Sequence, residues 1–189
     1  MERTFVMVKP DGMRGKLAGD IIKRYHEAGL RIVGMKVVFP DRELAEKHYP
    51  CHDAQIIGMG KRTKESLEEL GRTEDMYDMF NSDNPREIGL ILRQWLIEYV
   101  TSHPVIAMVL EGDNAIKSVR KLTGSTIPAK AEKGTIRGDL GCDTAEKAND
   151  ERRAIENLVH ASGSLDEAQR EIDLWFREEE IISYEGAKE

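Results

Sequence analysis

The sequence contains very little cysteine: Cys51 and Cys142 are the only two in 189 residues, and they do not form a Cys-x-x-Cys pair. A disulfide framework and a cysteine-based zinc site are therefore excluded. Long apolar runs are missing as well. The longest, from Val105 to Leu110, has six residues, whereas a membrane-spanning helix needs about 20. The first residues offer no apolar stretch as long as those of secretory signals. We therefore expect a cytoplasmic protein that does not enter a membrane.

The sequence also lacks an excess of positive charge. It has 28 Lys and Arg against 35 Asp and Glu, a formal net charge of −7, which argues against nucleic acid as a partner. There is no glycine-rich phosphate loop and no protein kinase motif, so any bound phosphate would be held by side chains. The 40% apolar and 33% charged residues are typical of a globular chain. Its length suits one domain, with room for an insertion.

Residue patterns divide most of the chain into short strands and helices. β-rich or apolar runs bounded by turn residues predict strands at 4–8, 31–39, 105–110 and 157–162. Helical spacing with capping residues predicts helices at 17–28, 41–49, 84–100, 113–123 and 164–176. This order of elements predicts an α+β sandwich with one small sheet.

Two stretches show weaker patterns. Residues 58–84 are polar with weak periodicity, and within them only 63–70 resembles a helix. Residues 125–149 show turn residues and charges but no recognisable element. A loop of that length inside a compact domain is usually either functional or wrongly assigned.

His160 is the histidine with the most informative neighbours, because it follows apolar residues and precedes Ser162. One interpretation is a core histidine beside a capped helix. The other is a nucleophile, since a neutral imidazole accepts a phosphoryl group near pH 7. A carboxylate would then hold one ring nitrogen, and Glu171 in the following helix is a candidate. Three other histidines lie among charged or turn residues and are expected to be solvated: His26, His48 and His103.

Cationic side chains near turns are the candidates for binding phosphate. Lys9 follows the first strand in a Lys-Pro-Asp-Gly turn, and is either an exposed turn residue or a point charge for a phosphate. Arg120, Thr126 and Arg137 offer two guanidinium groups and a hydroxyl, which suit phosphate oxygens. A charged surface loop is the alternative interpretation of these three.

Taken together, these segments resemble the nucleoside diphosphate kinase family. The matching runs occur in the family's order and are ERTF at 2–5, KPDG at 9–12, GDIIKR at 19–24, HY at 48–49, PVIAMVLEG at 104–112, GTIRGD at 134–139, NLVHAS at 157–162 and EIDLWF at 171–176. The resemblance implies a ferredoxin-like α+β sandwich with a four-stranded antiparallel sheet, in a homo-oligomer that is a hexamer or a tetramer. It also implies that the γ-phosphate of a nucleoside triphosphate passes through an enzyme histidine to a nucleoside diphosphate, with Mg²⁺ held by the nucleotide phosphates and not by protein side chains.

The resemblance also implies a set of functional residues. The family's nucleophile matches His160, and Ser162 and Glu171 match the residues beside it. The family's phosphate ligands match Lys9, Arg120, Thr126 and Arg137, and its ribose contacts match Lys9 and Asn157. Tyr49 matches the tyrosine that positions the lysine in this family. His52 matches a position that makes a further phosphate contact.

The chain departs from the family pattern in three places. Where the family usually has a phenylalanine against the base, this chain has Ile56 and Ile57, and we assign Ile57 to nucleotide binding. We expect one domain over 1–189, with a mostly helical insertion at about 58–93 and a smaller one at about 140–153. We predict a nucleoside diphosphate kinase. The alternatives are a catalytically weak nucleotide-binding scaffold or assembly partner of the same fold, and a phosphohistidine carrier.

Overall fold

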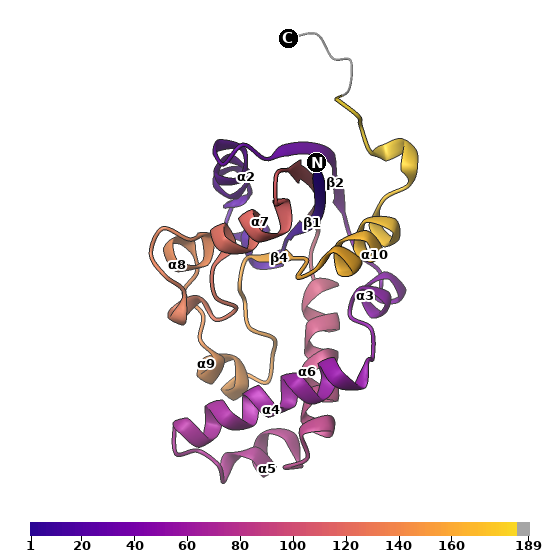
Figure 1. The fold of residues 1–189 in the computed structure, drawn as a ribbon. Helices are drawn as coiled ribbons and strands as arrows, with labels where there is room; N and C mark the ends of the chain where they lie inside the picture. The colour runs from indigo at the N-terminus through magenta and orange to yellow at the C-terminus, as the bar shows by residue number, and fades with distance from the viewer. Residues whose placement is uncertain (185–189) are drawn as a thin grey trace. The chain divides into compact units, whose positions relative to one another are not determined.

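The computed structural model describes residues 1–184, and these form two compact units (Figure 1). Unit 1 comprises residues 1–40, 103–142 and 157–184. Unit 2 comprises residues 41–102 and 143–156. Each unit is described by itself. Within the described residues, no helix combines the length and apolar character needed to cross a membrane.

Unit 1 is built on a four-stranded antiparallel sheet with the strand order β2-β3-β1-β4. Its strands are β1 (Glu2–Val8), β2 (Arg31–Val38), β3 (Val105–Gly112) and β4 (Val159–Ala161). The two central strands, β1 and β3, are almost entirely buried, which explains their unbroken apolar runs. The sheet confirms the predicted fold class.

Helices cover both faces of this sheet. They are α1 (Pro10–Arg14), α2 (Ala18–Glu27), α7 (Ala115–Thr123), α8 (Ile136–Leu140) and α10 (Leu165–Trp175), with short 3₁₀ turns at Pro128–Lys130 and Glu178–Glu180. On one face, Val6 and Val8 pack with Ile21 of α2 and Val119 of α7. Because side chains alternate along a strand, Phe5 points to the other face, where its ring lies 5.4 Å from that of Trp175 in α10.

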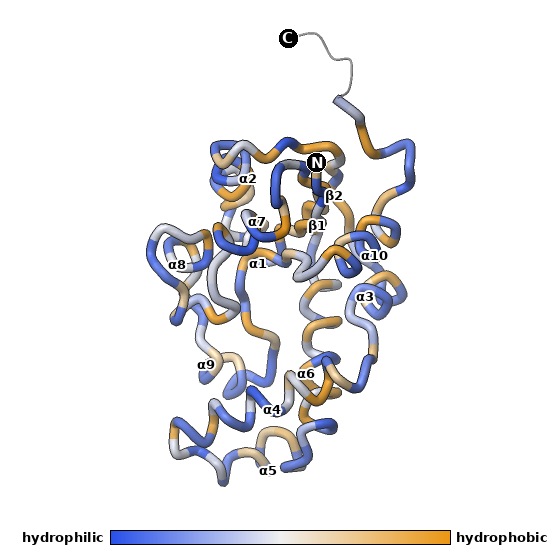
Figure 2. The backbone as a smooth tube through the Cα atoms, in the orientation of Figure 1, coloured by the Kyte–Doolittle hydropathy of each residue, from blue (hydrophilic) through white to orange (hydrophobic). Residues whose placement is uncertain are grey.

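Unit 2 is helical. It contains α3 (Arg42–His48), α4 (Asp53–Glu69), α5 (Asp75–Phe80), α6 (Pro85–Val100) and α9 (Ala145–Asp150). A small core forms from Leu67, Met76, Phe80 and Ile88, and α6 carries many of the hydrophobic residues coloured orange in Figure 2. This unit confirms that the insertion is mostly helical.

The contact between α4 and α6 depends on two glycines. A Cβ added to Gly60 would lie 1.8 Å from the carbonyl oxygen of Pro85, and one added to Gly89 would lie 2.0 Å from that of Ile56. Both distances are far below van der Waals contact, so the two helix backbones touch directly. Only glycine fits at either position.

Charged side chains attach residues 143–156 to the rest of unit 2. Arg72, just beyond α4, donates to Asp75 at 2.6 Å and to Asp150 of α9 at 2.7 Å. Within the segment itself, Arg153 forms a two-pronged pair with the buried carboxylate of Asp143, at 2.6 and 2.9 Å. The two segments in which the sequence predicted extra residues therefore meet in one unit.

The structure corrects several predictions about local structure. Residues 125–149 contain α8, α9 and a 3₁₀ turn, and α4 runs over Asp53–Glu69 instead of 63–70 alone. Helices of five or six residues such as α8 and α9 leave almost no periodicity, although each begins at a threonine N-cap. His48 is not solvated as predicted, since it is 2% exposed. Its position at the buried end of α3 overrides its charged neighbours.

Candidate active site

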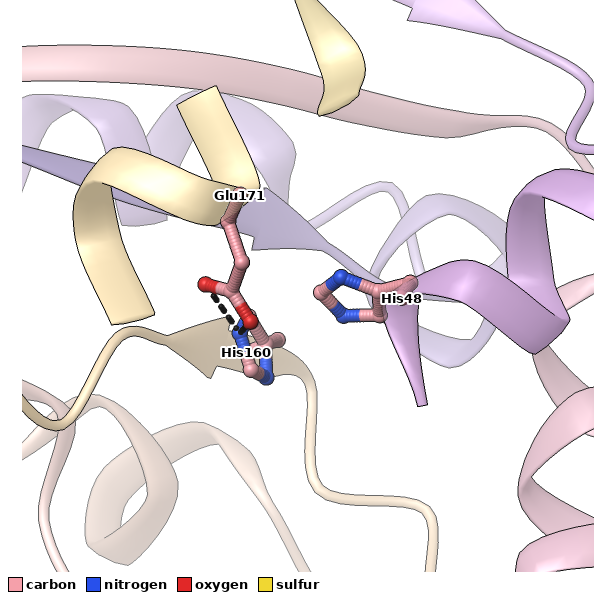
Figure 3. A group of neighbouring side chains, drawn as sticks. All are labelled: His48, His160 and Glu171. Atoms are coloured by element: carbon pink, nitrogen blue, oxygen red, sulfur yellow. Dashed lines mark hydrogen bonds and ion pairs between the residues drawn. The ribbon is translucent and has the colours of Figure 1, made fainter. Parts of the chain in front are cut away.

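The centre of the candidate site is the pair formed by His160 of β4 and Glu171 of α10 (Figure 3). Nε2 of His160 lies 2.9 Å from each oxygen of the Glu171 carboxylate. The carboxylate is 1% exposed and the ring is 16% exposed. An ionised carboxylate only accepts hydrogen bonds, so Nε2 carries the proton and the lone pair of the neutral ring is on Nδ1. His48, also drawn in Figure 3, belongs to unit 2.

The electrostatic surroundings keep this imidazole neutral. Burial is the main cause that lowers the pKa of His160 well below its ordinary range, and the charges of Lys9 and Arg137 lower it further, while Glu167 opposes them. Ser162 is fully buried and donates from Oγ to Glu171 Oε2 at 2.7 Å. A neutral, oriented imidazole is what nucleophilic attack requires.

A strained turn leads the chain into β4. Leu158 has φ of +66°, and the Val159 amide donates to the carbonyl of Asn157 at 2.7 Å. A three-residue turn with positive φ at a non-glycine residue costs free energy and persists only where its surroundings enforce it. Here the Leu158 amide donates to Asp11 Oδ2 at 2.9 Å, and the Leu158 carbonyl accepts from the Lys9 amide at 2.8 Å.

Arg137 also holds this turn. Its guanidinium donates to the carbonyls of Asn157 at 2.9 Å and Val159 at 2.6 Å, on the two sides of Leu158. A third bond, at 3.0 Å, goes to the carbonyl of Gly124. The sequence predicted Arg137 as a phosphate ligand. The structure adds a structural role, because this buried side chain binds three backbone carbonyls.

Lys9 lies at the end of β1 and is 4% exposed. Its ammonium donates to Asn157 Oδ1 at 2.8 Å, and Asn157 Nδ2 donates to the Thr126 carbonyl at 2.9 Å. Burial lowers the pKa of Lys9 to about 8, the charge of Arg137 acts in the same direction, and Asp11 opposes it. A buried ammonium with such a pKa is typical of a functional lysine.

Arg120 and Thr126 lie at more exposed positions in unit 1. Arg120 is in the last turn of α7, and its Nη1 would lie 3.4 Å from a Cβ added at Gly163. Its guanidinium therefore reaches the turn that follows Ser162. The eight predicted residues found in unit 1 are Lys9, Arg120, Thr126, Arg137, Asn157, His160, Ser162 and Glu171.

Three predicted site residues belong to unit 2. Tyr49 is half-buried directly after α3, where its carbonyl accepts from Arg93 Nε at 2.6 Å. His52 is exposed at the N-cap of α4, and Ile57 is half-buried in the first turns of that helix. Their functional roles remain predictions.

Sequence reasoning missed the contribution of Asp11. The Pro-Asp-Gly pattern predicts a turn, but Asp11 lies in the first turn of α1. Its carboxylate instead supports a segment 147 residues away in the chain. Only a tertiary structure shows such a contact, since nothing in the local sequence distinguishes this aspartate from an ordinary turn residue.

A neutral histidine held by a buried carboxylate, with the charges of Lys9 and Arg137 acting on it, has the properties that a histidine nucleophile requires. The sequence model of the family described as "Nucleoside diphosphate kinase" matches residues 2–57 and 91–181. This chain belongs to the nucleoside diphosphate kinase family.

Individual relatives agree with this assignment. A nucleoside diphosphate kinase from Archaeoglobus fulgidus is 41% identical over 189 residues, which cover 100% of this chain and 95% of the relative. The crystal structure of an NDP kinase from Pyrobaculum aerophilum is 42% identical, has a TM-score of 0.93 and covers 96% of this chain and 99% of its own. A Borrelia burgdorferi nucleoside-diphosphate kinase with bound vanadate and ADP, a transition-state mimic, is 33% identical with a TM-score of 0.75, covering 97% and 91% of the two chains.

The family model leaves one internal stretch of the chain unmatched. The family model does not match residues 58–90, which form the second part of α4, all of α5 and the first turn of α6. That gap is 33 residues, or about 17% of the chain, whereas the Pyrobaculum structure leaves only 4% of the chain uncovered. Most of this unmatched stretch therefore has a counterpart in that relative.

Proposed function

We propose that this enzyme transfers the γ-phosphate of a nucleoside triphosphate to a nucleoside diphosphate through a phosphate carried on Nδ1 of His160. The observation that carries the proposal is the contact of Nε2 with both oxygens of Glu171, which fixes the proton on Nε2 and the lone pair on Nδ1. The family assignment supports the same reaction.

The reaction has two balanced half-steps. The Nδ1 lone pair forms a bond to the γ-phosphorus while the bond to the β–γ bridging oxygen breaks, and the nucleoside diphosphate leaves with that electron pair. A terminal oxygen of a second nucleoside diphosphate then attacks the same phosphorus, and the N–P bond electrons return to His160. Glu171 stabilises the ring while it carries positive charge, which is electrostatic stabilisation of the transferred state.

Side chains of unit 1 would supply the nucleotide contacts. Lys9, Arg120, Thr126 and Arg137 are proposed for the phosphates, and Asn157 with Lys9 for the ribose. The buried Lys9–Asn157 hydrogen bond supports the last pair, because it fixes both groups before a ligand arrives. Tyr49, His52 and Ile57 keep the roles that the family resemblance implies, as proposals.

Magnesium is proposed to arrive with the nucleotide. Mg²⁺ takes oxygen ligands, usually phosphates and waters. Lys9 and Arg137 are cations, and the Glu171 carboxylate already accepts from His160 and Ser162. These residues therefore fit an ion held by the phosphates and not by side chains. When bound, the ion would neutralise charge on the transferring phosphoryl group.

A homo-oligomer is proposed on the basis of an exposed apolar strip formed by β2 and the residue that follows it. Met35, Val37 and Phe39 are 55%, 67% and 64% exposed, and β2 is an edge strand of the sheet. Exposed apolar edge strands readily pair with another chain. We propose that a second copy covers this strip, in a tetramer or a hexamer. One domain over 1–189 with two insertions, and a cytoplasmic location, also remain proposals.

The direct test of the function is a steady-state assay of phosphate exchange between a nucleoside triphosphate and a different nucleoside diphosphate. The proposal predicts turnover with several donors, because the groups assigned to phosphate and ribose do not read the base. A scaffold would bind nucleotide without turnover. A carrier protein would accept phosphate from another protein and ignore free triphosphates. Either result would contradict the proposal.

A further inference from the structure

The carboxylate of Glu171 has a further donor to which the family resemblance gives no role. Arg170 Nη2 donates to Glu171 Oε1 at 3.3 Å, with the arginine side chain 36% exposed. Adjacent residues on a helix project about 100° apart and do not normally face each other. The Arg170 side chain must therefore fold back along α10 to reach the carboxylate of its neighbour.

The two oxygens of Glu171 are thus held from two sides. Ser162 donates to Oε2 at 2.7 Å, Arg170 donates to Oε1, and His160 Nε2 lies 2.9 Å from both oxygens. The last torsion of a glutamate side chain is soft. A single donor would leave the carboxylate free to rotate, whereas two donors on different oxygens keep its plane directed at the ring nitrogen.

Charge gives Arg170 a second effect on this carboxylate. Glu171 is 1% exposed, and a buried carboxylate is costly unless a positive charge compensates it. His160 is neutral before phosphate transfer and cannot compensate it at that stage. Arg170 supplies a permanent cation beside Oε1, which offsets the cost of burying a carboxylate that accepts from Nε2–H.

We propose that Arg170 is a positioning residue for phosphoryl transfer, which holds the Glu171 carboxylate so that the His160 proton stays on Nε2 and the lone pair on Nδ1. The inference rests on the proposed role of His160. Arg170 acts through Glu171 and does not contact the nucleotide.

A double-mutant cycle tests this role. The cycle compares the parent with Arg170→Met, Glu171→Gln and the double variant. The first measurement is the single-turnover rate of phosphoenzyme formation at saturating triphosphate. The second is the dissociation constant for a nucleoside diphosphate. We expect Arg170→Met to slow phosphorylation about tenfold, as for loss of one charged hydrogen bond, with unchanged diphosphate affinity. In the Glu171→Gln background the same substitution should have no further effect. Arg170→Lys should restore part of the rate.

Arg177→Met is the matched control, since Arg177 also pairs with a nearby acid, Glu179, but is 74% exposed; its rate should equal that of the parent. All rates are measured below the melting temperature of the least stable variant. The proposal is overturned if Arg170→Met slows phosphorylation equally in the parent and in the Glu171→Gln background. It is also overturned if Arg170→Met weakens diphosphate binding, or if Arg170→Met is phosphorylated at the rate of the parent. His160→Gln separates the two ideas: if it still forms phosphoenzyme, the proposed function itself fails.

Discussion

The Lys9 ammonium is proposed to bind phosphate, but burying this charge lowers the free energy of unfolding. Its pKa is lowered from 10.5 to about 8, so between these pH values the unfolded chain holds a proton that the folded chain has released. Stability must therefore rise with pH across this window. Relative to Lys9→Met, the ligand-free parent should gain about 2 kcal/mol of unfolding free energy between pH 7.5 and 9.5.

Urea unfolding of both proteins across this pH range measures the difference, since contributions from other groups cancel in the comparison. Parallel pH curves would show that the Lys9 ammonium is not desolvated. Lys9→Met should also lower kcat/KM on the order of a hundredfold, as loss of a preorganised charged donor does.

Arg137 should matter for both stability and catalysis. Its guanidinium donates to three backbone carbonyls around the strained Leu158 turn. Arg137→Lys places one nitrogen where three were used, so it should lower the unfolding free energy by about 2–4 kcal/mol. The matched control is Arg24→Met, which removes a partly exposed pair with Asp139 and should cost less than about 1 kcal/mol. A parental melting temperature for Arg137→Lys would contradict this account.

At the scale of elements, the crossing of α4 and α6 offers a sharp test. Gly89→Ala would place a methyl group 2.0 Å from the Ile56 carbonyl, and we expect a loss of about 3 kcal/mol or more because backbone must move. Gly58→Ala in the same hairpin is the control: its nearest neighbour is Arg62 Nη1 at 3.4 Å, and it should be neutral or stabilise by up to about 1 kcal/mol. Denaturant unfolding measures both. Equal stabilities for the two variants would mean that the helices do not touch at Gly89.

The sequence predicted some elements well for identifiable physical reasons. Capping residues such as Asn84 and Ser164 begin α6 and α10 as predicted, because local hydrogen bonds determine these boundaries. The long α4 was underestimated because much of it is polar, and its stability comes from packing against α6. Similarly, the fold-back of Arg170 and the Asp11–Leu158 contact depend on tertiary structure, which a local pattern does not record.

At the scale of the whole molecule, the exposed strip on β2 makes a prediction about assembly. Val37→Asp places a charge in the centre of Met35, Val37 and Phe39, so burying the strip against a second copy becomes costly. We expect light scattering to show a smaller particle for this variant than for the parent. Tyr77→Asp, at another exposed position (60%), should leave the particle mass unchanged. A parent that is already monomeric, or a Val37→Asp variant of parental mass, would show that the strip is not an interface.

The most direct test of the central claim is to incubate the enzyme with γ-labelled nucleoside triphosphate and locate the label. The account predicts an acid-labile phosphoprotein with the phosphate on Nδ1 of His160, which disappears when a nucleoside diphosphate is added and does not form in His160→Gln. A His160→Gln protein that is labelled to the same extent as the parent, or label on Nε2, would contradict the account.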